Sequence, residues 1–315
     1  MSRNARKALL AGLIDDAGLF PPASLTMREA VTAHRKSRDG PNGWMLARFI
    51  CPASRLPELE QSLPNQDDLG PWRLSVILDG AGDPFLERAV SDLSAARRFS
   101  KTGSGSVRLE VIEVPLPQEI DAPLLRKFVE AIEDAGLPDL VTFLEVPRTA
   151  ALPATLEIIA DLRNEAGARA SRAPGVKLRC GGASQDLFPS PARVASFIHW
   201  CKRVGVPLKA TAGLHHPFRH ADRRTGFVHH GFVNLVGAAI LVSAHDLDAD
   251  ALEEIVSDQD PASFSLTPGR FSWKDLSASA SEIDAARARL FISYGSCSFA
   301  EPVEDLTALG ILPLS

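Results

Sequence analysis

Residues 207–220, PLKATAGLHHPFRH, combine side chains that can move protons, form covalent bonds or bind metal. Lys209 lies inside a short apolar run, and His215 and His216 follow it closely. A neutral lysine can attack a carbonyl carbon, whereas histidines transfer protons or ligate divalent cations. The stretch therefore indicates a catalytic lysine, a metal site beside a lysine, or a buried ammonium group paired with a carboxylate.

Carboxylates and a second lysine occur at the ends of similar apolar runs. Glu113 and Glu145 each begin the tripeptide EVP, and Lys177 stands in GVKLRCGG, residues 175–182. Lys177 and Arg179 are two residues apart, as are Lys209 and Thr211. In a strand such pairs share one face, while the alternate positions are apolar and suit contact with an outer helix layer. Since an unpaired buried charge is costly, the cations should meet the carboxylates.

Short β-rich runs that end in Pro, Gly or Asp alternate with amphipathic segments along most of the chain. Such runs are typical of buried parallel strands. Seven are clear, at residues 44–53, 73–80, 107–115, 140–147, 175–182, 207–213 and 290–296. Helices are expected between them, for example over 121–136 and 190–205, where Asp121 and Ser190 are candidate N-caps.

This order predicts an α/β fold, a (β/α)8 TIM-like barrel, with an N-terminal helix and an irregular segment around 214–280. A doubly wound open sheet is the alternative, but no GxGxxG nucleotide loop or P-loop is present. We expect residues 1–315 to form a single barrel domain. An eighth strand is uncertain. Within 227–277, FVNLVGAAILVSA favours a helix by its length, and SFSLTPGRFSW fits either a hairpin or a modified seventh barrel strand.

Barrel enzymes place their chemistry at the C-terminal ends of the strands. That rule predicts a site with catalytic and substrate-binding side chains. The catalytic candidates are Lys209, Lys177, Glu145, Glu113 and His215, and the substrate-binding candidates are Arg179, Arg48, Thr211, Ser296 and Asp16.

Two features leave alternatives open. Residues 14–24, IDDAGLFPPAS, are expected to form a stiff loop after the first helix, which either covers the bottom of the barrel or brings Asp15 or Asp16 to the site. His215 and His216, with Glu113 or Glu145, are candidate ligands for a divalent metal. The spacing of these histidines matches no familiar metal-ligand motif. A divalent metal is therefore an open alternative, and the sequence indicates no other cofactor.

KATAG, Lys209 to Gly213, resembles the lysine-bearing strand end of the deoxyribose-phosphate aldolase family. The resemblance implies an imine-forming lysine, which in such aldolases lies on barrel strand six, the position that the seven clear runs give to Lys209. A lyase of the aldolase type acting on a small carboxylate- or phosphate-bearing metabolite is therefore our first hypothesis. A metal-dependent lyase, isomerase or hydrolase is the second, and a non-catalytic binding barrel is the third.

Composition limits the partners and the cellular location that we expect for the protein. The formal net charge is −5, which disfavours nucleic-acid partners and anionic membrane surfaces. The longest apolar run is too short to cross a bilayer. The four cysteines form no CxxC pair and no disulfide framework, so a cytoplasmic location is expected. The expected partner is a small-molecule substrate, and the sequence leaves the oligomeric state open, a homo-oligomer included.

Overall fold

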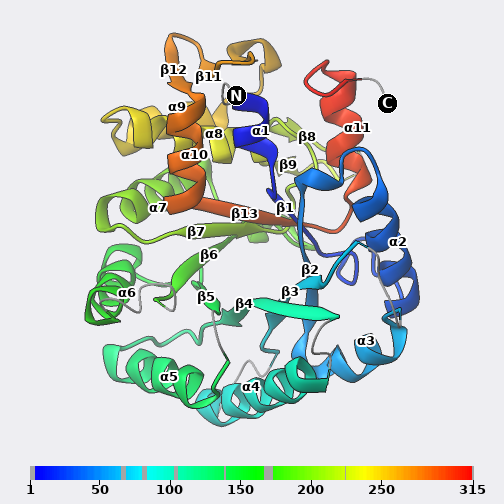
Figure 1. Ribbon diagram of the computed structural model, residues 1–315. Helices are drawn as coiled ribbons and strands as arrows, with labels where there is room; N and C mark the ends of the chain where they lie inside the picture. Colours follow the sequence, from blue (N-terminus) through cyan, green and yellow to red (C-terminus); the bar gives the residue numbers. More distant parts are fainter. Residues whose placement is uncertain are drawn as a thin grey trace.

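The computed structural model describes residues 4–64, 69–79, 84–102, 106–137, 140–166, 173–223 and 225–313. Eight parallel strands form a closed barrel, with the order β1-β13-β7-β6-β5-β4-β3-β2 around the ring, and helices surround it (Figure 1). The predicted α/β barrel is thus confirmed. Its strands are β1 (Ile14–Asp16), β2 (Leu46–Pro52), β3 (Trp72–Ile77), β4 (Val107–Pro115), β5 (Val141–Glu145), β6 (Gly175–Arg179), β7 (Leu208–Thr211) and β13 (Phe291–Ser296).

The eighth strand is not where we expected it. Residues 14–16, assigned to a loop from the sequence, form β1, which pairs with β13 on one side and β2 on the other. Two of its three residues are aspartates, which are rare in strands, so the sequence pattern does not indicate a strand here. The partners that stabilise these aspartates lie far away in the chain. As a consequence, Lys177 lies on the sixth barrel strand, and Lys209 lies on the seventh rather than the sixth.

The helices that follow the strands form the outer layer. Two of them begin where their sequences predict. Asp121 accepts a hydrogen bond from the Leu124 amide at the start of α5, and Ser190 is the N-cap of α7. Gly205 ends α7 in the left-handed conformation, with φ of 71°. The helices are α1 (Ala5–Leu10), α2 (Met27–Asp39), α3 (Leu56–Ser62), α4 (Phe85–Thr102), α5 (Ala122–Asp134), α6 (Leu152–Ala166), α7 (Pro191–Val204), α8 (Phe232–Ala244), α9 (Ala249–Ser257), α10 (Ala280–Arg289) and α11 (Ala300–Ala308).

The segment between β7 and β13 contributes no barrel strand among its described residues. The apolar run forms α8, as its length predicts, and β10 (Phe264–Leu266), β11 (Arg270–Trp273) and β12 (Leu276–Ser279) form a separate antiparallel sheet. The hairpin prediction is therefore confirmed, and the modified barrel strand is wrong. A second small ladder, β8 (His220–Ala221) with β9 (Val228–His229), carries two of the loop histidines.

Close packing inside the barrel requires a glycine at the start of β6. A Cβ on Gly175 would lie 2.7 Å from the Phe143 ring and 2.7 Å from the Pro207 carbonyl oxygen, both too close for real contacts. Any larger residue would therefore displace the ring of Phe143 or the entry to β7. The ring in turn lies 5.5 Å from the Lys209 Nζ atom, so this packing helps to fix the lysine.

Candidate active site at the barrel interior

Lys209 is buried in the barrel interior between two carboxylates. Its Nζ lies 2.7 Å from Asp15 Oδ2 and 2.5 Å from Glu113 Oε1, and only 1% of its side chain is exposed. Lys209 is therefore not a surface lysine, and it is held by acids from the first and fourth barrel strands. The partnership with Glu113 was expected from the sequence, whereas the one with Asp15 depends on the unexpected strand β1.

Lys177 extends the arrangement toward the C-terminal end of the barrel. Its Nζ lies 2.7 Å from Glu113 Oε2 and 2.8 Å from Glu145 Oε2. Arg179 Nε lies 2.7 Å from the other oxygen of Glu145. These side chains, together with Lys209 and Asp15, form a run of alternating charges that we call the interior charge ladder.

Strand register explains why these side chains meet. Glu145 pairs with Lys177, and Lys177 pairs with Lys209, across the neighbouring strands β5, β6 and β7. Arg179 pairs with Thr211 one step closer to the strand ends. Alternation along each strand turns these residues inward, as predicted, while Val176 and Leu178 face the helices.

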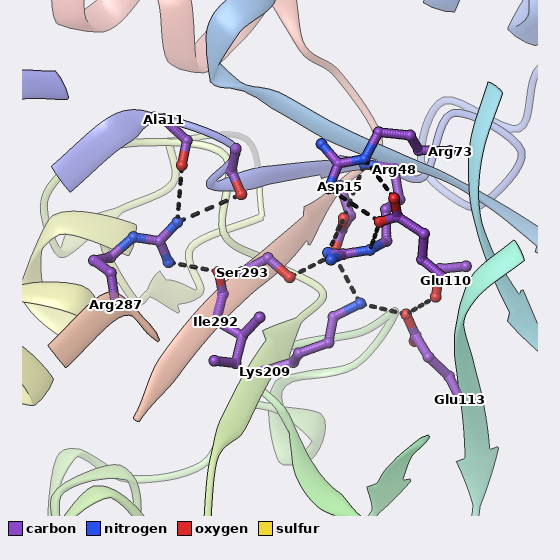
Figure 2. A network of polar contacts seen from close by, with 12 residues as sticks. Ala11, Asp15, Arg48, Arg73, Glu110, Glu113, Lys209, Arg287, Ile292 and Ser293 are labelled. Carbon is purple, nitrogen blue, oxygen red and sulfur yellow. Dashed lines mark hydrogen bonds and ion pairs between the residues drawn. The ribbon is translucent and has the colours of Figure 1, made fainter. Parts of the chain in front are cut away.

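The ladder continues toward the N-terminal ends of the strands (Figure 2). Arg48 donates its backbone amide to Asp15 Oδ1, and its guanidinium lies 3.5 Å from the same oxygen and 3.0 Å from Glu110 Oε2. Arg73 closes the series by a bidentate contact with Glu110 at 2.9 and 3.0 Å. The series thus runs without a break from Arg179 to Arg73.

Arg48 therefore does not lie where the sequence placed it. It is the third residue of β2, and its contact with Glu110 directs it to the N-terminal half of the barrel rather than the mouth. Glu110 faces inward because β4 has an irregular register opposite Leu74 and Ser75. Such a bulge re-aims one side chain, which allows both Glu110 and Glu113 to reach the interior.

Hydroxyl groups complete the carboxylate environment. Ser75 donates to Glu113 Oε1 at 2.6 Å, and Ser293 donates to Asp15 Oδ2 at 2.6 Å. Both serines are fully buried. Each carboxylate thus receives a hydroxyl in addition to ammonium partners, which favours its ionised form.

The electrostatic environment keeps the ladder charged. Burial alone would raise the pKa of Glu113, but the ammonium groups of Lys177 and Lys209 outweigh burial and hold that pKa well below its ordinary value. For Asp15 and Glu145 the same balance of burial against neighbouring cations also lowers the pKa. For Lys177, burial would lower the pKa, but Glu113 and Glu145 outweigh it and raise the pKa.

Solvent reaches the ladder at both of its ends. At the N-terminal strand ends Arg73 has 46% of its side chain exposed, and the other opening is the mouth at the C-terminal strand ends. Arg179, the last residue of β6, has 43% of its side chain exposed, and Glu145 has 12% exposed. Asp15 and Glu113, in contrast, are 0% and 1% exposed. A substrate that enters the mouth would therefore meet Arg179 and Glu145 first and Lys177 next.

Two of the predicted substrate-binding residues are occupied by structural contacts. Asp16 accepts hydrogen bonds from the Gly18 amide and from His34 Nδ1, both at 2.9 Å. Ser296 donates to the Ser298 carbonyl at 2.7 Å. Thr211 lies at the end of β7 beside Arg179 and is half-buried, so it is close to the predicted site.

The predicted metal ligands are not brought together. His215 Nδ1 lies 3.0 Å from Glu301, and His216 Nδ1 lies 2.6 Å from Asp305, both in α11. Glu113 and Glu145 bind the ladder cations instead. Across the part of the chain that the structure describes, no group of three or more His, Cys, Asp or Glu side chains has an arrangement that could hold a metal ion. Burial lowers the pKa of His215, so this imidazole is a weak base.

Sequence reasoning left open that Asp15 reaches the site but did not identify it as a direct partner of Lys209, and it missed Ser75, Arg73 and Glu110. Ser293 was among the positions that the strand-end rule selected, without a partner assigned to it. The doublet Asp15-Asp16 directly after the apolar Leu13-Ile14 was the one available signal, because charged residues at the end of an apolar run also mark the other barrel strands. Nothing comparable marks Glu110, which depends on the irregular register of β4.

Fold and interior together define a (β/α)8 barrel whose axis carries a continuous ladder of paired charges, open to solvent at the mouth. No protein-family model matches the chain, and no curated protein sequence matches it. Among the described residues, no helix is long and apolar enough to cross a membrane.

Proposed function

We propose that the protein is an enzyme of the lyase class, of the aldolase type, that acts on a small carbonyl compound bearing a carboxylate or phosphate. The observation that supports this proposal best is the pair of lysine ammonium groups that share Glu113 beneath a mouth lined by Glu145 and Arg179. Arg179 is the group for the substrate anion, because guanidinium binds carboxylate and phosphate in a bidentate manner.

Lys177 is the preferred imine-forming residue. The resemblance to deoxyribose-phosphate aldolases has two parts, and they point to different lysines: the KATAG sequence contains Lys209, but the sixth strand carries Lys177. Both lysine side chains are almost completely buried, at 2% and 1% exposed. The surroundings favour Lys177, because it contacts the partly exposed Glu145, whereas both acids around Lys209 are almost completely buried. Lys209 then acts by sharing the charge of Glu113.

The chemistry begins with loss of a proton from Lys177, since only a neutral amine attacks a carbonyl. Glu145 and Glu113 are hydrogen-bonded to the ammonium and can accept that proton. The amine nitrogen bonds to the carbonyl carbon, and the oxygen leaves as water with one proton from the amine and one from the carboxyl group that took the Lys177 proton. When the neighbouring carbon–carbon bond breaks, its electron pair moves to the protonated imine and leaves an enamine. The hydroxyl on the departing carbon loses its proton to a carboxylate, so this fragment leaves as an aldehyde. Protonation of the enamine carbon and hydrolysis by water then free Lys177.

Borohydride trapping tests the proposal. The protein is incubated with pyruvate, acetaldehyde or glyceraldehyde 3-phosphate, reduced with borohydride, and mapped by peptide mass spectrometry. We expect a stable adduct on Lys177, none on the exposed Lys202, and no loss of adduct with EDTA. An adduct on Lys209 would overturn the choice of lysine. If no carbonyl compound in a broad panel is trapped and Lys177→Met retains the turnover of the wild type, the imine mechanism is wrong.

A further inference from the structure

A cavity lies at the opposite end of the barrel from the mouth. It has a volume of about 600 Å³ and is lined by residues at strand starts and helix ends. Its apolar surface includes Val111, Val141, Phe143 and Ile292. The volume falls in the range of small-molecule sites, which run from about 300 to 1,000 Å³. The cavity is therefore large enough for a metabolite.

The charged groups around this cavity are mainly cationic. Among the described residues that line it, Arg48, Arg163, Lys202 and Arg289 contribute four positive side chains, and Glu282 is the one acid. The Glu282 carboxylate is already engaged, because it accepts hydrogen bonds from the backbone amide and hydroxyl of Ser279 at the start of α10. Arg48 is balanced by Asp15 and Glu110. The other three cations outnumber the single Glu282 carboxylate, so the cavity carries an excess of positive charge.

Two of these cations are fixed in place, and two are adjustable. Arg163 donates to the carbonyl oxygens of Ala173 and Pro174 at 2.8 and 3.0 Å, and burial lowers its pKa. Arg48 is fixed by Asp15 and Glu110. Lys202 and Arg289 are exposed residues in the last turns of α7 and α10, where a cation also complements the helix dipole. Their flexible side chains can turn toward a ligand in the cavity.

From this combination we infer that the cavity is a binding site for a small organic anion with an apolar body, which is held by Lys202 and Arg289 over the apolar surface. A carboxylate or phosphate on an aliphatic or aromatic body has this chemistry. An inorganic anion lacks the apolar part and should bind more weakly, because it buries no apolar area.

The location separates this site from the proposed active site. The mouth lies at the C-terminal strand ends, whereas this cavity is lined by residues next to the strand starts, such as Pro207 and Leu290. Arg48 lines the cavity and also contacts Asp15, which in turn holds Lys209. An anion held by Lys202 and Arg289 would lie in the cavity that the fixed Arg48 guanidinium also lines, and its negative charge would act on the Asp15–Lys209 pair from there. The site is therefore suited to regulate the ladder.

Calorimetric titration with octanoate, phenyl phosphate and inorganic phosphate tests the inference on the full chain. We expect at least one organic anion to bind more tightly than inorganic phosphate, and the double variant Lys202→Gln/Arg289→Gln to weaken that binding at least about fivefold, since two exposed charge contacts are lost. The matched control is Arg203→Gln, which removes an exposed cation from the same turn of α7 that does not line the cavity.

A second variant tests the position of the ligand. Ala285 lines the cavity and is exposed, so Ala285→Phe should fill the space without disturbing the core and should also weaken binding. Arg179→Gln at the mouth should leave the affinity unchanged. The inference is overturned if neither organic anion binds, if the double variant binds as the control does, or if Arg179→Gln abolishes binding and so places the probe at the mouth.

Discussion

Lys177 and Lys209 are register partners on adjacent barrel strands, and their ammonium groups contact the two different oxygens of Glu113. One buried carboxylate therefore balances two buried cations, with Asp15 and Glu145 at the outer sides. The three groups form a single electrostatic unit, because a change in any of them alters the charge balance of the other two. The first prediction follows from this arrangement.

Replacing Glu113 by Gln should destabilise the protein strongly. The variant leaves two buried ammonium groups with one carboxylate each, and breaking a buried ion pair on one side costs about 3–5 kcal/mol. Urea denaturation at pH 7 measures the loss in the free energy of unfolding. Ser75→Ala is a milder control, because it removes a hydroxyl donor to Glu113 but keeps every charge.

A double-mutant cycle shows whether the charges act as a unit. Adding Lys177→Met to Glu113→Gln removes one of the two cations that share this carboxylate, so the double variant should be more stable than the sum of the single losses predicts. Strict additivity of the two losses would contradict the shared role of Glu113.

The sequence predicted the barrel well because its strands are apolar runs of regular spacing. The inward direction of Lys177 and Lys209 followed from alternation within single strands, and Glu145 was expected as an acid that balances them. All three lie in the ladder. The strand β1 could not be found in the same way. Asp15 and Asp16 occupy two of its three positions, and their burial depends on distant partners, Lys209 and His34.

Some site residues were placed wrongly from the sequence, because their contacts depend on strand register and on partners that are distant in the chain. Arg48 was placed at the mouth because it lies in a strand, but its distance from the strand end directs it to Glu110 instead. His215 and His216 follow a strand end closely, yet α11 provides their carboxylate partners from the far end of the chain. Local spacing carries no information about such partners.

The pH dependence of stability should be steep on the acid side. The pKa values of Asp15, Glu113 and Glu145 are lowered in the folded protein. Each contributes stability that is complete above its unfolded pKa, near 4, and is lost as pH falls through the folded pKa. The free energy of unfolding should thus fall steeply below about pH 4.5. A shallower decrease between about pH 7 and 5 is expected from His215, His229 and His230, because folding lowers the pKa of each. Denaturation curves at a series of pH values measure it.

The matching variant is Glu145→Gln. It removes one of the three carboxyl groups, so the acid slope should decrease by up to about 1.4 kcal/mol per pH unit. Between pH 5 and 7 the curve should stay parallel to that of the wild type. An unchanged acid slope would contradict the low pKa of Glu145.

Arg287 should stabilise the closure of the barrel. Its guanidinium donates to the carbonyl oxygens of Phe291 and Ile292 and to those of Ala11 and Gly12, so it joins the last strand to the turn before the first (Figure 2). Arg287→Met should cost about 2–3 kcal/mol of unfolding free energy, because buried carbonyl groups lose their donors. Arg289→Met, at an exposed position of the same helix, should change it by less than about 0.5 kcal/mol. Equal losses would contradict the role of Arg287.

The last prediction concerns the acidity of the proposed nucleophile. Burial opposes the charge of Lys177, and Glu113 and Glu145 together raise its pKa. Glu145→Gln removes one of these two acids, so the pKa of Lys177 should fall. A larger neutral fraction is then present at a given pH. The pH profile of borohydride trapping should therefore move to lower pH, while the amount trapped at high pH stays the same.

Glu110→Gln is the control, because Glu110 is the partner of Arg48 and Arg73 rather than of Lys177. A profile that moves equally in both variants would show that general loss of negative charge, and not the contact with Glu145, sets the reactivity of Lys177.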